Sequence, residues 1–188
     1  KSTPENSEEE IAVIGVSGRY PMAKDLEELW ANLCEGKDCI TPIPGTRWDN
    51  REYYSENKSE LGKIYLDKGG FMEDIDKFDP LFFGISPNEA ILEDPHERLF
   101  LETVWHTLED GGYTKKTIAG KDVGVYVGVM WGQYQLLSGE VKGTLYPGIT
   151  SYSSIANRVS YFLDLKGPSI AIDTMCSSSL TAIHLACE

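Results

Sequence analysis

The stretch that decides the fold joins an apolar run to an apolar helix through a single cysteine. Residues 169–187 read SIAIDTMCSSSLTAIHLAC. Residues 169–173 are predicted to form a strand, and beyond Cys176 the apolar side chains recur at helical spacing, as at Leu180 and Ile183. The sequence therefore places Cys176 at a strand-to-helix junction, on the first turn of the helix.

This position favours a reactive thiol. Unpaired N–H groups and the positive end of the helix dipole converge at a helix start, where they stabilise a thiolate. The same N–H groups could hold the oxyanion that forms when a thiolate attacks a carbonyl. The alternative is a buried cysteine that merely packs. The junction and the three serines at residues 177–179 favour the reactive interpretation.

The chain upstream alternates predicted strands and helices. A buried strand is expected at residues 11–16. A second strand is expected at residues 123–129, where glycines suggest close approach of another backbone. Helices are expected from the Asp25 cap to Gly36, from the Asp94 cap to Gly111 with Glu97 closing a capping box, and over residues 152–162. Residues 38–87 form a long irregular excursion, and residues 1–10 a linker. The order predicts a layered α/β fold.

Composition limits the class of protein. The 188 residues are 41% hydrophobic and carry a net charge of −13, as expected of a soluble globular chain that binds neither nucleic acid nor membrane surfaces. No apolar run reaches the roughly 20 residues that span a bilayer, and the polar start is unlike a signal peptide, so a cytoplasmic location is expected. Four cysteines are too few for a disulfide scaffold and fit no zinc pattern; Cys34 and Cys39 are expected to be inert.

Five segments together resemble β-ketoacyl synthase domains of modular polyketide synthases. The octapeptide DTMCSSSL at 173–180 is similar to the active-site cysteine signature of that family. The other four are IAVIG with GRYP, FDP with FGISP, DPHERL and EDGGY, between residues 11 and 113. Met175 and the ANRVSY stretch at 156–161 most resemble synthases served by a free-standing acyltransferase. His96 stands where the family usually has Gln, a position interpreted as structural.

The resemblance implies a thiolase-like fold, of which residues 11–188 are the N-terminal part, a tight homodimer and a two-step reaction. Cys176 would take an acyl chain from the phosphopantetheine of an acyl carrier protein. A carbanion formed by decarboxylation of malonyl on a second carrier protein would then attack the thioester. No directly bound cofactor or metal is implied. Met175 and Trp131 are candidates for the substrate pocket.

The family's two enolate-binding histidines belong to a later part of the domain. His184 lies eight residues beyond Cys176, about 12 Å of helical rise, and is out of reach. His106, inside a helix, is interpreted as a packing or surface residue. Residues 1–188 alone are therefore expected neither to condense acyl units nor to fold stably, because they need the remainder of their own synthase domain.

Three other functions stay open at this point. A non-elongating synthase would keep the fold and Cys176 and would only pass the acyl chain onward. A structural module would only dimerise or dock, which the complete cysteine signature disfavours. A cysteine hydrolase would need a histidine near the nucleophile, and none is placed to serve.

Overall fold

A computed structural model of the chain describes residues 10–136, 138–141, 144–147 and 151–188. The chain divides into two compact units, residues 17–77 and residues 1–16 with 78–188, which we describe separately. The predicted 1–10 linker lies almost wholly outside the described residues. No described helix is both long and apolar enough to cross a membrane.

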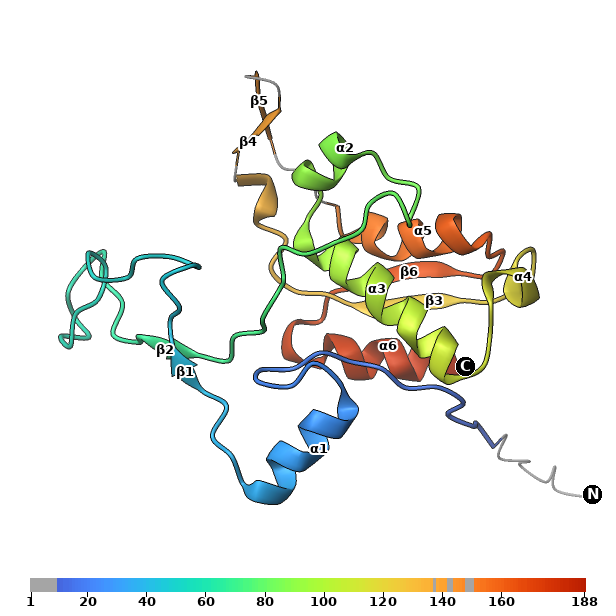
Figure 1. Cartoon of the computed structure of the whole chain (residues 1–188), viewed down its shortest axis with the longest axis horizontal. Helices are drawn as coiled ribbons and strands as arrows, with labels where there is room; N and C mark the ends of the chain where they lie inside the picture. Colours follow the sequence, from blue (N-terminus) through green and yellow to red (C-terminus); the bar gives the residue numbers. More distant parts are fainter. Residues whose placement is uncertain (1–9, 137, 142–143, 148–150) are drawn as a thin grey trace, which may run out of the picture. The chain divides into compact units, whose positions relative to one another are not determined.

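The larger unit holds a parallel strand pair between helices (Figure 1). Its helices are α2 (Pro87–Leu92), α3 (Pro95–Asp110), α4 (Lys115–Ile118), α5 (Tyr152–Leu163) and α6 (Ser178–Cys187), with 3₁₀ turns η1 (Tyr134–Leu136) and η2 (Met175–Ser177). Its strands are β3 (Val125–Gly128), β4 (Ser138–Val141), β5 (Thr144–Pro147) and β6 (Ser169–Ile172). β3 pairs with β6 in parallel, from Val125 opposite Ser169 to Gly128 opposite Ile172, and β4 pairs antiparallel with β5.

The two faces of β3 meet different helices because side chains alternate along a strand. Val125 and Val127 are buried in the same core as Ile155 and Val159 of α5. Gly128 points the other way, against the backbone of α6. The strand pair therefore lies between α5 and α6, and α3 packs on α5 (Figure 1).

The helix of residues 95–110 forms as predicted, but its capping box does not. Asp94 is the N-cap, and its Oδ1 accepts a hydrogen bond from His96 N at 2.9 Å. The Glu97 side chain, fully buried, instead contacts Ser154 and Arg158 of α5. A carboxylate with an arginine partner gains more from that pairing than from capping a backbone N–H in its own turn.

The predicted buried strand at residues 11–16 is wrong for the described structure. These residues form no assigned strand, and Ile11, Val13 and Ile14 are each more than half exposed. Val16 N donates to Asp110 Oδ2 at 2.8 Å, a side-chain contact in place of a strand ladder. A strand is defined by its hydrogen bonds to a neighbouring strand, and no described strand of this chain pairs with residues 11–16.

The smaller unit is mostly irregular, as expected, around α1 (Leu26–Glu35) and a short ladder of β1 (Thr41–Pro42) with β2 (Lys68–Gly69). Asp25 Oδ1 accepts from Glu28 N at 2.9 Å, and Gly36 ends the helix at φ 62°. Glu28 accepts from Lys24 N, one residue before the N-cap. The local caps of this helix were thus readable from sequence.

Candidate active site

Cys176 lies in the turn between β6 and α6. It is exposed with a free thiol, and it belongs to η2, the 3₁₀ turn that runs directly into α6. The prediction placed it on the first helical turn; it sits two residues before that turn begins. Ser177, the N-cap of α6, makes no side-chain capping hydrogen bond, and the N–H of Ser178 donates to Met175 O within η2.

The backbone bends sharply just before the cysteine. Met175 has φ 59°, in the left-handed region that side chains other than glycine rarely adopt. Asp173 Oδ1 accepts from Met175 N at 3.0 Å and so closes a side-chain turn over the bend. The bend presents the next residue, Cys176, with an exposed thiol at the end of the strand.

The start of α6 is set by its contact with β3. A β-carbon on Gly128 would lie 2.5 Å from Ser179 N and 2.6 Å from the Ser178 carbonyl carbon. The expected close backbone approach is thus seen at Gly128, whereas a β-carbon on Gly124 would meet side-chain atoms of Tyr126 and Pro168. Ala182 of the same helix is 4% exposed, but Leu180 is 73% and Ile183 61% exposed. The helix is therefore covered on one side in this chain.

Of the two candidate pocket residues, Trp131 lies at a cavity that Met175 does not line. Trp131, at φ 71°, lines a cavity of about 420 Å³ with Asp94, His96 and Tyr134. Met175 is not among the residues of that cavity and is 56% exposed. His96 Nδ1 lies 3.1 Å from Asp94 Oδ1, so the residue that replaces the family Gln pairs with the helix cap.

The remaining histidines lie on exposed surfaces of their helices. His184 is in the last turn of α6, where its Nδ1 lies 3.9 Å from Glu188 Oε1. His106 lies on the surface of α3, with Nδ1 3.1 Å from Glu109 Oε2. Both side chains are more than 60% exposed.

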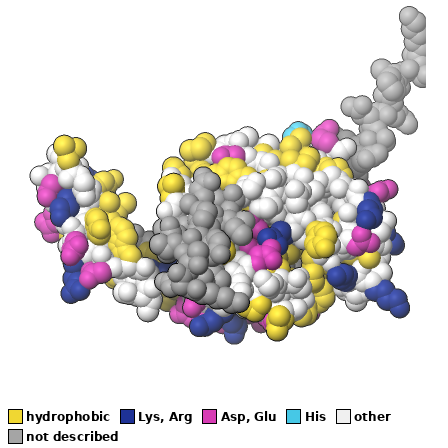
Figure 2. All heavy atoms as spheres, turned by 90° about the horizontal axis from the view of Figure 1, so that it is seen from above, with side chains coloured by type: hydrophobic (Ala, Val, Ile, Leu, Met, Phe, Trp, Pro, Cys, Tyr) yellow, Lys and Arg dark blue, Asp and Glu magenta, His cyan; other side chains and the backbone are white. Residues whose placement is uncertain are grey.

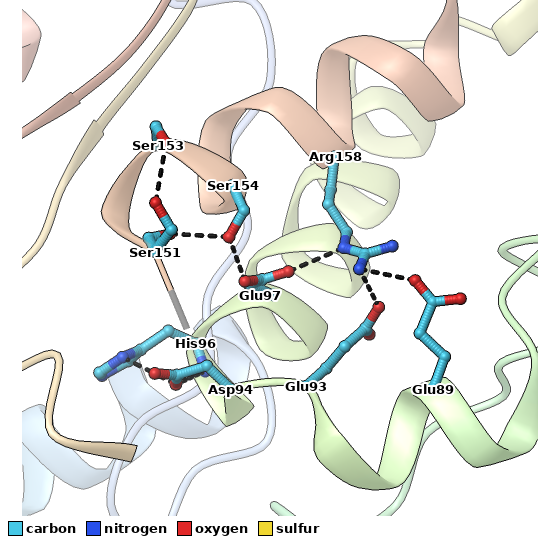
Figure 3. Close-up of polar contacts among 9 residues, drawn as sticks. All are labelled: Glu89, Glu93, Asp94, His96, Glu97, Ser151, Ser153, Ser154 and Arg158. Carbon is cyan, nitrogen blue, oxygen red and sulfur yellow. Dashed lines mark hydrogen bonds and ion pairs between the residues drawn. The ribbon is translucent and has the colours of Figure 1, made fainter. Parts of the chain in front are cut away.

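A partly buried ion network joins α2 and α3 to α5 (Figure 3), and the sequence patterns described above did not predict it. Arg158 Nη2 lies 2.8 Å from Glu89 Oε1 and 2.6 Å from Glu93 Oε1, and its Nε lies 2.8 Å from Glu97 Oε2. Glu93 and Glu97 are fully buried. Part of the signal was present, because the three glutamates recur every four residues in the sequence.

Burial governs the charge state of Glu93. Loss of solvent raises the pKa of its carboxyl to about 7, and the neighbouring Glu97 and Glu89 push in the same direction, while Arg158 and Arg98 oppose the shift. Neither Glu93 oxygen has a partner in hydrogen-bond geometry, although Arg158 is close. Arg158 is therefore the shared cationic partner of three carboxylates, and the carboxyl of Glu93 is the one that burial makes easiest to protonate.

Comparison with known proteins decides the family. The family model "Beta-ketoacyl synthase, N-terminal domain" matches residues 8–188. The chain belongs to the β-ketoacyl synthase family. It is 56% identical over its whole length to Polyketide synthase PksL of Bacillus subtilis, and 50% identical over 98% of its length to Polyketide synthase ThaG of Burkholderia thailandensis. It spans 4% and 3% of those relatives.

Solved ketosynthases have the same fold. An oxazolomycin ketosynthase domain of Streptomyces albus superposes with a TM-score of 0.90 at 51% identity, over 96% of this chain and 31% of that one. The ketosynthase from module 6 of the bacillaene synthase of Bacillus subtilis gives 0.80 at 42%, over 93% and 28%. The expected α/β thiolase-like fold, first part only, and the resemblance to polyketide ketosynthases are confirmed.

Proposed function

We propose that Cys176 is the acyl-carrying nucleophile of a condensing ketosynthase domain in polyketide biosynthesis. The observation that carries the proposal is the position of Cys176, exposed at the bend between β6 and α6 in a chain of this family. The thiolate sulfur attacks the thioester carbonyl of an acyl carrier protein. A new S–C bond forms, the phosphopantetheine thiol leaves, and the carbonyl remains electrophilic as a thioester.

Condensation is the second step. Malonyl on a carrier protein loses CO₂, the resulting carbanion attacks the thioester carbon, and the Cys176 thiolate leaves. Groups that bind the developing enolate would come from the remainder of the synthase domain, since the three histidines of this chain lie elsewhere. The substrates arrive on phosphopantetheine, and no directly bound cofactor or metal is needed.

The finer assignments rest on the motifs. Met175 and the ANRVSY stretch support a synthase served by a free-standing acyltransferase. We place Met175 and Trp131 at the substrate pocket of the complete domain, with Trp131 already lining a cavity. We also propose that the complete domain is a cytoplasmic homodimer and that the segment from Tyr152 to Asp173 lies near its interface.

Exposed apolar side chains support the need for the remainder of the domain. Figure 2 shows hydrophobic side chains open on one face of the molecule, between acidic and basic ones. On α6, Leu180 and Ile183 are mostly exposed, and each Å² of apolar surface left in water costs about 25 cal/mol. We therefore expect residues 1–188 alone to be inactive in condensation and poorly protected from hydrogen exchange over α6.

A product assay separates condensation from mere acyl transfer. The complete domain is incubated with an acyl carrier protein bearing a short acyl chain and a second one bearing malonyl, and both carriers are weighed by mass spectrometry. A β-ketoacyl product on the second carrier is expected. Acyl transfer to Cys176 without any β-ketoacyl product would instead favour the non-elongating alternative. Cys176→Ala should abolish both reactions.

A further inference from the structure

The hydroxyl of Ser178 bridges the two residues that precede Cys176. Its Oγ accepts a hydrogen bond from Thr174 N at 2.9 Å and donates one to Met175 O at 2.7 Å. Ser178 is 4% exposed, whereas Ser177 and Ser179 beside it are exposed. Of the three serines that follow Cys176, this one is built into the fold.

The bridge spans the strained part of the turn. Met175 has φ 59°, a left-handed conformation that is strained for a residue with a β-carbon. Thr174 N lies just before that bend and Met175 O just after it, and the one hydroxyl holds both. A buried hydroxyl paired in both directions also avoids the penalty that an unpaired one would carry.

Neighbouring contacts hold the same turn less directly. Ser177 Oγ donates to Thr174 O at 2.9 Å, but its side chain is exposed. The backbone of Ser178 is itself fixed by Gly128, which leaves no room for displacement toward β3. Ser178 thus connects the fixed start of α6 to the bend that aims Cys176.

We propose that Ser178 is a positioning residue for acylation: its hydroxyl holds the left-handed backbone of Met175 and thereby aims the Cys176 thiol. This inference rests on the proposed role of Cys176 as nucleophile. A nucleophile that is displaced by even a fraction of an ångström loses much of the advantage of its orientation. Ser178 touches no reacting atom and acts through the backbone.

The test is a double-mutant cycle on the complete synthase domain, with the rate of Cys176 acylation by an acyl thioester as the readout. Ser178→Ala should slow acylation by about tenfold or more, since a displaced nucleophile loses much of its rate. Glycine adopts a positive φ without strain, so Ser178→Ala should cost much less in a Met175→Gly background. Ser178→Thr, which keeps the hydroxyl, should restore most of the rate, and Ser179→Ala controls for the loss of a nearby hydroxyl.

Three results would overturn the inference: wild-type rates in Ser178→Ala, an equal loss in the Met175→Gly background, or an equal loss in Ser179→Ala. If Ser178→Ala does not fold, exchange of the Thr174 amide in the wild-type domain decides, because slow exchange is expected and fast exchange contradicts the bridge. Failure of the proposed function is distinguishable, since the wild-type domain would then show no acyl adduct on Cys176 at all.

Discussion

A β-carbon on Gly128 would lie 2.5 Å from the backbone nitrogen of Ser179, closer than side-chain atoms pack. This contact holds the first turn of α6, which begins two residues beyond Cys176, against β3. The position of Cys176 therefore depends on the absence of a side chain at residue 128.

Gly128→Ala should destabilise the complete domain by about 1–3 kcal/mol, because the added methyl meets backbone that cannot move aside. It should also slow acylation of Cys176. Urea denaturation measures the first effect and thioester labelling the second. Gly45→Ala is the matched control, since a β-carbon there meets nothing within 4 Å. Equal stability of the two variants would contradict the role of Gly128.

Arg158→Ala should destabilise the domain by roughly 3–5 kcal/mol, because it leaves the buried carboxylates of Glu93 and Glu97 without their counter-charge. Chemical denaturation of the complete domain checks this value. Arg51→Ala removes an exposed ion pair with Asp49 and should have no measurable effect. A loss for Arg158→Ala no larger than that of the control would show that the network contributes nothing.

Glu93 should make the domain less stable as the pH rises from about 4.5 toward 7. Its pKa is raised from 4.5 to about 7 in the folded chain, chiefly by burial, so the folded state binds more protons than the unfolded state in this window. Ionisation of Glu93, which faces Arg158, Arg98, Glu89 and Glu97, therefore opposes folding.

Glu93→Gln should flatten the pH dependence of the unfolding free energy between pH 5 and 7. Urea denaturation at several pH values measures the slope, with Glu56→Gln, at an exposed position, as the control. A slope in Glu93→Gln equal to that of the wild type would refute the assignment of this titration to Glu93.

Tyr161→Glu should weaken the proposed dimer of the complete domain. Tyr161 is 90% exposed on α5, and Ile170 of the adjacent β6 is 40% exposed, so apolar surface lies open on the segment proposed for the interface. Sedimentation velocity should show a dimer for the wild type and for Leu61→Glu, and more monomer for Tyr161→Glu. An unchanged dimer would remove this segment from the interface.

Local signals predicted the helices of this chain well. Asp25 and Gly36 bound α1, and Asp94 and Gly111 bound α3, because caps involve residues only a few positions apart. The short helix α2 went unpredicted, yet it carries the same kind of signal, with Ser86 Oγ accepting from Glu89 N and Pro87 as its first residue.

Contacts distant in sequence explain what the patterns missed. Glu97 looked like a capping residue, but its carboxylate pairs with Arg158, 61 residues later. The apolar run at 11–16 has strand composition, and composition alone cannot supply the neighbouring strand that a ladder requires. At the candidate site the junction of strand and helix around Cys176 was predictable, whereas the bridge of Ser178 and the seat at Gly128 depend on packing.

The intact mass of the complete domain, recorded after incubation with an acyl thioester, tests the central claim most directly. Wild-type protein should gain the mass of one acyl group, and peptide mapping should place it on Cys176. Cys176→Ala should gain nothing, while Cys34→Ala, which removes another exposed thiol, should be labelled like the wild type. Full labelling of Cys176→Ala, or no adduct on wild-type Cys176, would contradict the account.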